Sequence, residues 1–159
     1  MRKMLLVALG VVFVVADIVS VSAQTSDPRV GAWKLNVAKS KFSRGPPPQS
    51  NTLKVEASGQ GEKVTTEGIN AEGGRTATQY TANYDGKDYP LTGSQFGADT
   101  VSLKRIDTRT TERTDKKGST VVQTLRRVVS QDGKTMTVTT KGTNAQGQAM
   151  NNVAVFDKQ

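Results

Sequence analysis

From Ser50 to the end of the chain, apolar and polar residues alternate in short segments. Leu53, Val55 and Ala57 occupy one face of such a segment, and polar residues occupy the other. A period of two places successive side chains on opposite faces of a strand, and Gly-containing turn segments separate antiparallel neighbours. Four-residue turns with Ser, Asn or Asp first and Gly fourth are expected at 58–61, 70–73, 115–118 and 144–147, and two-residue turns at 85–86 and 132–133. The pattern predicts an all-β antiparallel fold.

Ten strands are predicted between these turns. Short connections favour an up-and-down β-barrel, in which closure removes the exposed sheet edges. A β-sandwich of two sheets fits the same periodicity. The predicted strands are 30–35, 50–57, 62–69, 75–84, 87–92, 100–106, 109–115, 119–130, 134–143 and 148–157.

The segment between the first two strands has its own signals. Asn36 is placed to cap one helical turn, with Val37 and Phe42 facing inward. The run Gly45-Pro46-Pro47-Pro48 follows, and prolines without backbone N–H groups favour an extended connector.

The first 23 residues have the pattern of a secretory signal peptide. Arg2 and Lys3 precede an apolar run from Leu5 to Ala16, which is too short to span a membrane, and Val21 and Ala23 suit cleavage after Ala23. Residues 24–29 are polar and predict a flexible N-terminal arm, and residues 30–159 form the single barrel domain. We therefore expect an exported protein, periplasmic or secreted, without a transmembrane anchor after cleavage.

Composition argues against several kinds of catalytic site. The chain contains no histidine and no cysteine, so it lacks the common general base, the thiol nucleophile and the usual zinc ligands. Acidic residues remain, but their positions in turns or on charged strand faces predict solvated roles. We expect a protein that is not an enzyme and uses no metal or cofactor. The acidic residues considered are Glu62, Glu67, Glu72, Glu112, Asp88 and Asp99.

Strand parity identifies the residues that face the interior of a barrel. Arg105 shares a face with Val101 and Leu103, and Arg127 shares one with Leu125 and Val129. These arginines, with nearby tyrosine hydroxyls, are candidates to bind a carboxylate or phosphate head group. Alternatively, their charged ends extend into water, or Arg127 stacks on Trp33 at a barrel end. The candidate ligand-binding residues are Trp33, Tyr80, Tyr84, Tyr89, Arg105 and Arg127.

A second candidate surface is basic. The net charge is +8, from 22 Lys and Arg against 14 Asp and Glu, and a cluster of these basic residues lies between 104 and 117. Such a cluster is able to attract anionic envelope polymers, but no aromatic residue accompanies it, so nucleic acid is not expected. Acidic residues interrupt the cluster, and a solvated hairpin is the simpler interpretation. The residues of this polyanion patch are Lys104, Arg109, Arg113, Lys116 and Lys117.

The two ends of the barrel domain resemble a known superfamily. Gly31-Ala32-Trp33 resembles the opening of lipocalins and fatty-acid-binding proteins, the calycin barrels, and Val155-Phe156-Asp157-Lys158 resembles the last strand of the latter. The segments 33–36 and 39–42 also resemble a group of small exported bacterial proteins. The lid helices and the late Arg-x-Tyr clamp of fatty-acid-binding proteins are missing. The resemblance implies a barrel that binds a small apolar or amphipathic molecule, and the alternative is a surface interaction module for anionic envelope polymers or a protein partner.

Overall fold

The computed structural model describes residues 27–143 and 147–159. All ten predicted strands are present, with bounds within a few residues of those expected. They are β1 (Gly31–Leu35), β2 (Ser50–Ser58), β3 (Gly61–Ile69), β4 (Arg75–Asn83), β5 (Tyr89–Thr92), β6 (Thr100–Arg105), β7 (Thr110–Lys117), β8 (Thr120–Val129), β9 (Thr135–Thr143) and β10 (Ala149–Lys158). The predicted signal peptide, the first residues of the arm and most of the turn at 144–147 lie outside the described residues.

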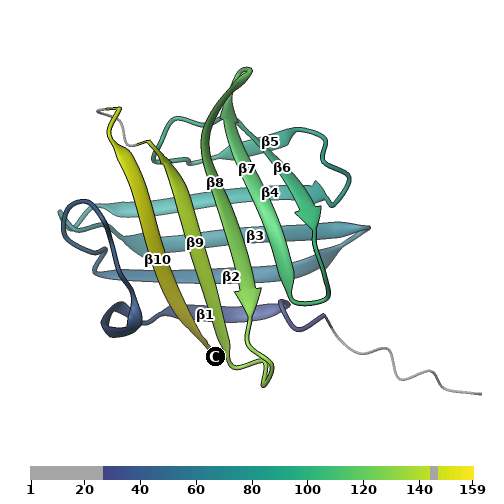
Figure 1. The fold of residues 1–159 in the computed structure, drawn as a ribbon, viewed down its shortest axis with the longest axis horizontal. Coiled ribbons are helices and arrows are strands. Elements are labelled where there is room, and N and C mark those ends of the chain that lie inside the picture. The colour runs from purple at the N-terminus through teal and green to yellow at the C-terminus, as the bar shows by residue number, and fades with distance from the viewer. Residues whose placement is uncertain (1–26, 144–146) are drawn as a thin grey trace, which may run out of the picture.

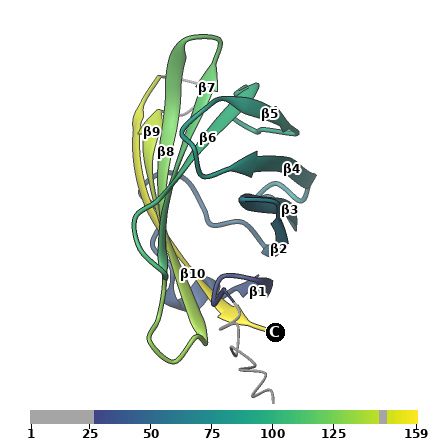
Figure 2. The ribbon, with the colours of Figure 1, turned by 90° about the vertical axis from the view of Figure 1, so that its right-hand side faces the viewer.

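The strands form a closed antiparallel barrel, which confirms the barrel and excludes the sandwich. Each strand pairs with its neighbours in sequence, and β1 closes the barrel against β10 with Leu35 opposite Phe156. In Figure 1, β7 to β10 cross in front of β1 to β4, and Figure 2 shows the two walls from the side. Side chains from both walls therefore meet in the interior.

The barrel core is apolar around Trp33, whose side chain is fully buried. Trp33 packs in one cluster with residues from both walls, among them Leu53, Leu103, Met136 and Phe156. Burial of an aromatic side chain in such a core contributes about 1.5–3 kcal/mol or more.

The segment after β1 contains one turn of 3₁₀ helix, η1 (Val37–Lys39). The Asn36 side chain accepts a hydrogen bond from the Lys39 backbone N at 3.1 Å, which confirms the predicted cap. The inward orientation predicted for Val37 is wrong, because its side chain is exposed. The connector then joins the barrel wall where Lys41 pairs with Val153. Within the described residues, no helix is long and apolar enough to cross a membrane.

Three turns differ from their predictions. The two-residue turns expected at 85–86 and 132–133 are longer connections, since residues 84–88 join β4 to β5 and residues 130–134 join β8 to β9. The turn expected at 115–118 lies at Gly118 and Ser119, because β7 continues through Asp115 to Lys117. Alternation along β7 then directs Thr111, Arg113 and Asp115 into the barrel, where all three are buried. This shift places two charged side chains in the interior.

Candidate ligand-binding site

A carboxylate, Glu62, is buried inside the barrel at the centre of a hydrogen-bonded group, the Glu62 cluster (Glu62, Tyr80, Tyr84 and Arg127). The hydroxyls of Tyr80 and Tyr84 each donate to the Glu62 carboxylate at 2.7 Å. The Arg127 guanidinium donates to the same carboxylate and, through Nη2, to the Tyr80 hydroxyl at 3.2 Å. Glu62 comes from β3 and Arg127 from β8, so this ion pair joins the two walls.

The charges of the Glu62 cluster follow from its environment. Burial alone would raise the pKa of Glu62, but the charge of Arg127 and the three donors outweigh it and lower that pKa. Burial, together with the Glu62 charge, raises the pKa of Tyr84 to about 12 and also raises that of Tyr80. The cluster is therefore a carboxylate–guanidinium pair with two neutral phenols. The solvated role predicted for Glu62 is wrong.

A second buried group, the Asp115 cluster, contains Arg113, Asp115 and Gln123. Arg113 binds the Asp115 carboxylate through two nitrogens, with Nη2 at 2.8 Å, and the Gln123 amide donates to it at 2.7 Å. The Arg113 guanidinium also lies 4.7 Å from the centre of the Tyr80 ring, which links the two clusters. Charged and polar groups thus extend across the barrel interior from one cluster to the other.

A third group, the Asp27 cluster (Asp27, Arg29, Tyr84 and Arg105), lies at the barrel end where β1 begins. Asp27 accepts from Arg29 Nε at 2.8 Å and from Arg105 Nη2 at 2.6 Å. The two guanidinium carbons lie 5.0 and 4.6 Å from the Tyr84 ring centre. The Arg29 carbonyl accepts from the Trp33 indole N–H at 2.9 Å, and the Arg29 side chain is 1% exposed. Residues 27–29 are therefore packed, which differs from the flexible arm predicted over 24–29.

These contacts change the pKa of the Asp27 carboxylate. Partial burial acts to raise it, but hydrogen bonds and charge from Arg29, with a further contribution from Arg105, outweigh that effect and lower the pKa. Asp27 is thus ionised near neutral pH and shared between two cations.

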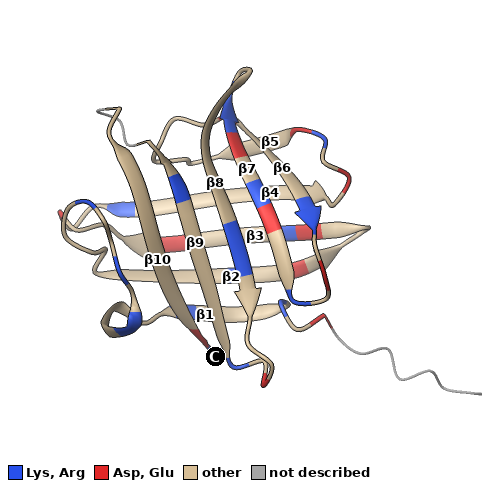
Figure 3. Ribbon diagram, in the orientation of Figure 1, with Lys and Arg blue, Asp and Glu red and all other residues tan. Residues whose placement is uncertain are grey.

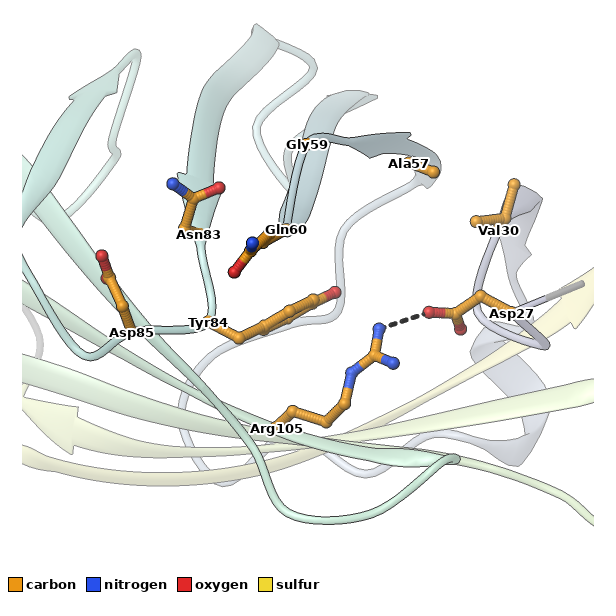
Figure 4. Close-up of a pocket in the computed structure, with 10 residues that line it drawn as sticks. Asp27, Val30, Ala57, Gly59, Gln60, Asn83, Tyr84, Asp85 and Arg105 are labelled. Atoms are coloured by element: carbon orange, nitrogen blue, oxygen red, sulfur yellow. Dashed lines mark hydrogen bonds and ion pairs between the residues drawn. The ribbon is translucent and has the colours of Figure 1, made fainter.

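A pocket of about 820 Å³ opens beside the Asp27 cluster, and we call it the mouth pocket. Figure 4 shows Tyr84 and Arg105 at its base, with Gln60 and Asn83 on one side and Val30 on the other. The tight turn at Gly59 and Gln60 forms part of the rim, and Gly59 adopts φ +55°, which favours glycine. The lining residues are Asp27, Val30, Ala57, Gly59, Gln60, Gly61, Asn83, Tyr84, Asp85 and Arg105.

The structure places the six predicted ligand-binding residues in four different surroundings. Tyr84 and Arg105 line the mouth pocket, whereas Tyr80 and Arg127 belong to the buried Glu62 cluster. Trp33 lies in the core, where Lys158 rather than Arg127 is placed over its ring at 5.0 Å. Tyr89 does not line the mouth pocket itself, but its hydroxyl donates to the carboxylate of Asp85, which does.

The polyanion patch is not one surface. Arg113 points into the barrel, and Lys116 pairs with Asp88 at 2.8 Å. Arg109 precedes β7 and Lys117 ends it, so the two lie roughly 25 Å apart by the rise of a strand. Figure 3 shows basic and acidic positions alternating along β7. The remaining patch residue, Lys104, pairs across the sheet with Glu112.

Sequence reasoning missed five residues of these clusters: Asp27, Arg29, Glu62, Asp115 and Gln123. Glu62 had a usable signal, since it has the same parity as Val64 in the predicted strand. Asp27 and Arg29 had none, because their partners Arg105 and Tyr84 are distant in sequence. Among the described residues, no group of three or more His, Cys, Asp or Glu side chains is arranged to hold a metal ion.

Comparison with the models of known protein families gives no match, and comparison with curated proteins gives none either. Among solved structures, the chain is similar to a zebrafish ileal bile acid-binding protein crystallised with cholic acid. The identity is 13%, the TM-score is 0.49, and the match covers 83% of this chain and 99% of that one. The barrel described above depends on the strand pairing of this chain, not on that likeness.

Proposed function

We propose that this chain is an exported, non-enzymatic binding protein that holds a small amphipathic molecule in the mouth pocket. The observation that supports this most directly is a pocket of about 820 Å³ at one end of a closed barrel, with Arg105 and Tyr84 facing into it. Pockets of roughly 300–1,000 Å³ with a few convergent polar groups are typical of small-molecule sites.

The lining suggests how a ligand would be oriented. Val30 and Ala57 offer apolar contact, while Gln60 and Asn83 offer amide donors and acceptors. The Glu62 and Asp115 clusters occupy the interior behind the pocket, so a long apolar chain running through the barrel would have to displace buried ion pairs. A compact molecule with one polar end therefore suits the site better than an extended one.

Two further parts of the proposal depend on the sequence. The absence of histidine and cysteine from the chain leaves a binding role as the simpler function. Export follows from the signal peptide predicted at 1–23. Detection of a mature protein beginning at Gln24 in the envelope fraction or the medium would support export, and a chain retaining Met1 in the cytoplasm would contradict it.

The ligand is tested by native mass spectrometry of the mature protein, purified gently from its export compartment and compared with a denatured, delipidated sample. We expect a stoichiometric small molecule that is lost on denaturation and changes Trp33 fluorescence when it is added back. Trp33 reports on the site because its indole N–H binds the Arg29 carbonyl of the adjoining Asp27 cluster.

A matched pair of variants locates the binding site. Ala57→Phe fills the mouth pocket and should weaken binding at least about tenfold, equivalent to about 1.4 kcal/mol. Thr81→Phe adds the same ring at an exposed position of β4 and should bind normally. Equal binding by both variants would place the ligand elsewhere, and a bare polypeptide mass with no fluorescence response would contradict the proposed function.

A further inference from the structure

Seven buried polar side-chain atoms of the described residues lack a hydrogen-bond partner, and three of them lie on two neighbouring residues inside the barrel. The other four belong to Arg29, Asn51, Thr100 and Gln123. Arg127 Nε and Nη1 and Thr111 Oγ have no partner among the described residues, although each is almost fully shielded from solvent. Arg127 is 4% exposed and Thr111 is 0% exposed. Because an unpaired buried donor costs about 1–3 kcal/mol, more when charged, such atoms indicate a missing binding partner.

These atoms lie together because of the strand register. Thr111 is directly opposite Arg127 on β8 and Arg105 on β6, so the three residues form one inward row across three strands. Directly opposed residues have Cβ atoms about 4.5–5.5 Å apart, which brings a threonine hydroxyl within reach of arginine side chains on both sides. Arg105 also lines the mouth pocket, so one end of this row reaches solvent.

The charge balance of the three clusters also favours an anion. Glu62 pairs with Arg127 and Asp115 pairs with Arg113, but Asp27 is the only carboxylate paired with both Arg29 and Arg105. The three carboxylates therefore leave one guanidinium charge without its own partner. This excess lies at the mouth, where the Arg105 side chain is 44% exposed, so it attracts an anion toward the interior but is partly screened by water.

Hydrogen-bonding capacity supports the same conclusion. The free Nε–H and Nη1–H groups of Arg127 donate only, and the Thr111 hydroxyl is also able to donate. An anion accepts from all of them and brings no hydrogens that need acceptors. The Glu62 carboxylate already accepts from Arg127 Nη2 and two tyrosines, so it leaves Nε and Nη1 free.

We propose that a singly charged anionic group binds between Thr111 and Arg127, behind Arg105. The group is either a small free anion of carboxylate type or the carboxylate end of a molecule that enters through the mouth pocket. The first source is independent of the proposed function, and the second depends on it.

The test uses two threonine variants. Thr111→Val removes the proposed donor and keeps the branched shape, so the barrel should fold and should be slightly more stable without ligand. Thr100→Val is the matched control, because Thr100 Oγ1 is also buried and has no partner in the described part of the chain, yet Thr100 pairs with Lys116 rather than with an inward arginine.

In the first arm, melting temperature is measured against sodium formate concentration at constant ionic strength. For a free-anion site, the wild-type melting temperature should rise by about 5 °C per tenfold increase above the dissociation constant. The Thr100→Val variant should respond in the same way, and Thr111→Val should lose most of the response.

In the second arm, binding of cyclohexanecarboxylate is compared with binding of cyclohexylmethanol, since both are compact molecules with one polar end. For a head-group site, the carboxylate should bind at least about tenfold more tightly than the alcohol, and Thr111→Val should abolish that preference while Thr100→Val keeps it. Either Thr111-dependent effect supports the site and identifies its source. If neither the formate response nor the preference for the carboxylate depends on Thr111, the anion site is refuted, and continued binding of cyclohexylmethanol would show that the proposed function survives without it.

Discussion

Replacing Glu62 by glutamine removes one buried negative charge while nearly preserving the shape of the side chain. In the folded protein, Glu62 accepts hydrogen bonds from Tyr80, Tyr84 and Arg127 and is 1% exposed. The neutral amide keeps one acceptor oxygen but leaves the Arg127 charge buried without a counter-ion. Loss of one partner of a buried ion pair costs about 3–5 kcal/mol.

A loss of this size is large compared with the total stability of a domain, which is typically 5–15 kcal/mol. For a domain of this length it corresponds to a decrease of about 10–20 °C in melting temperature. The measurement is urea unfolding followed by Trp33 fluorescence, with thermal unfolding as a second probe. Glu67→Gln is the control, because Glu67 lies on the same strand with its side chain exposed, and it should change stability by less than about 0.5 kcal/mol.

A double variant separates the buried charge from the lost hydrogen bonds. Glu62→Gln combined with Arg127→Met removes both charges, so it should be more stable than Glu62→Gln alone. If Glu62→Gln loses less than about 1 kcal/mol of unfolding free energy, or if the double variant loses the sum of both single losses, the Glu62–Arg127 ion pair does not stabilise the interior.

Three further predictions concern pH and local stability. The pKa of Glu62 is lowered below its ordinary 4.5, so the contribution of this carboxylate to stability should be complete above about pH 4.5 and be lost as pH falls through the folded-state pKa. Acid unfolding curves should show this loss, and the stability of Glu62→Gln should depend less on pH. Because the pKa of Tyr84 is raised from 10.0 to about 12, the free energy of unfolding should decrease between these two pH values. In Tyr84→Phe the free energy of unfolding should change less over this range, and the same change as in the wild type would contradict the burial of Tyr84 beside Glu62. Strand β5 has only four residues and two residue pairs with each neighbour, so its amide hydrogens should exchange fastest among the strands; slower exchange in β5 than in β3 would refute this.

The strands could be predicted because the residues of each strand show which of its faces is buried. Apolar Leu53 and Val55 alternate with polar Thr52 and Lys54 for this reason alone, and the turn residues mark the ends of each segment. The short connections favoured a closed barrel, but the same periodicity fits a sandwich, and only the pairing of β1 with β10 decides between them.

The interior polar groups were harder to predict, because burial of a charge is decided by its partner. Glu62 looked like a solvated acid until Arg127, on the opposite wall, provided its counter-charge. Asp115 was placed in a turn because Asp-Lys-Lys-Gly matches turn preferences, whereas the cross-strand ladder extends β7 two residues farther. Parity was a sufficient signal for Glu62, but nothing local indicates that Asp27 meets Arg105.

Closure through β1 and β10 also has a consequence for how the molecule folds. Lys158 of β10 donates to the carbonyl of Pro28, 130 positions earlier in the chain, so the final contacts join the earliest and latest described segments. Pairing over such a separation costs loop-closure entropy and is slow compared with hairpin formation. Until β10 is available, β1 and β9 present unpaired edges to other chains. A chain that closes only at its last strand therefore completes its barrel, and covers its two open edges, only after β10 has been synthesised.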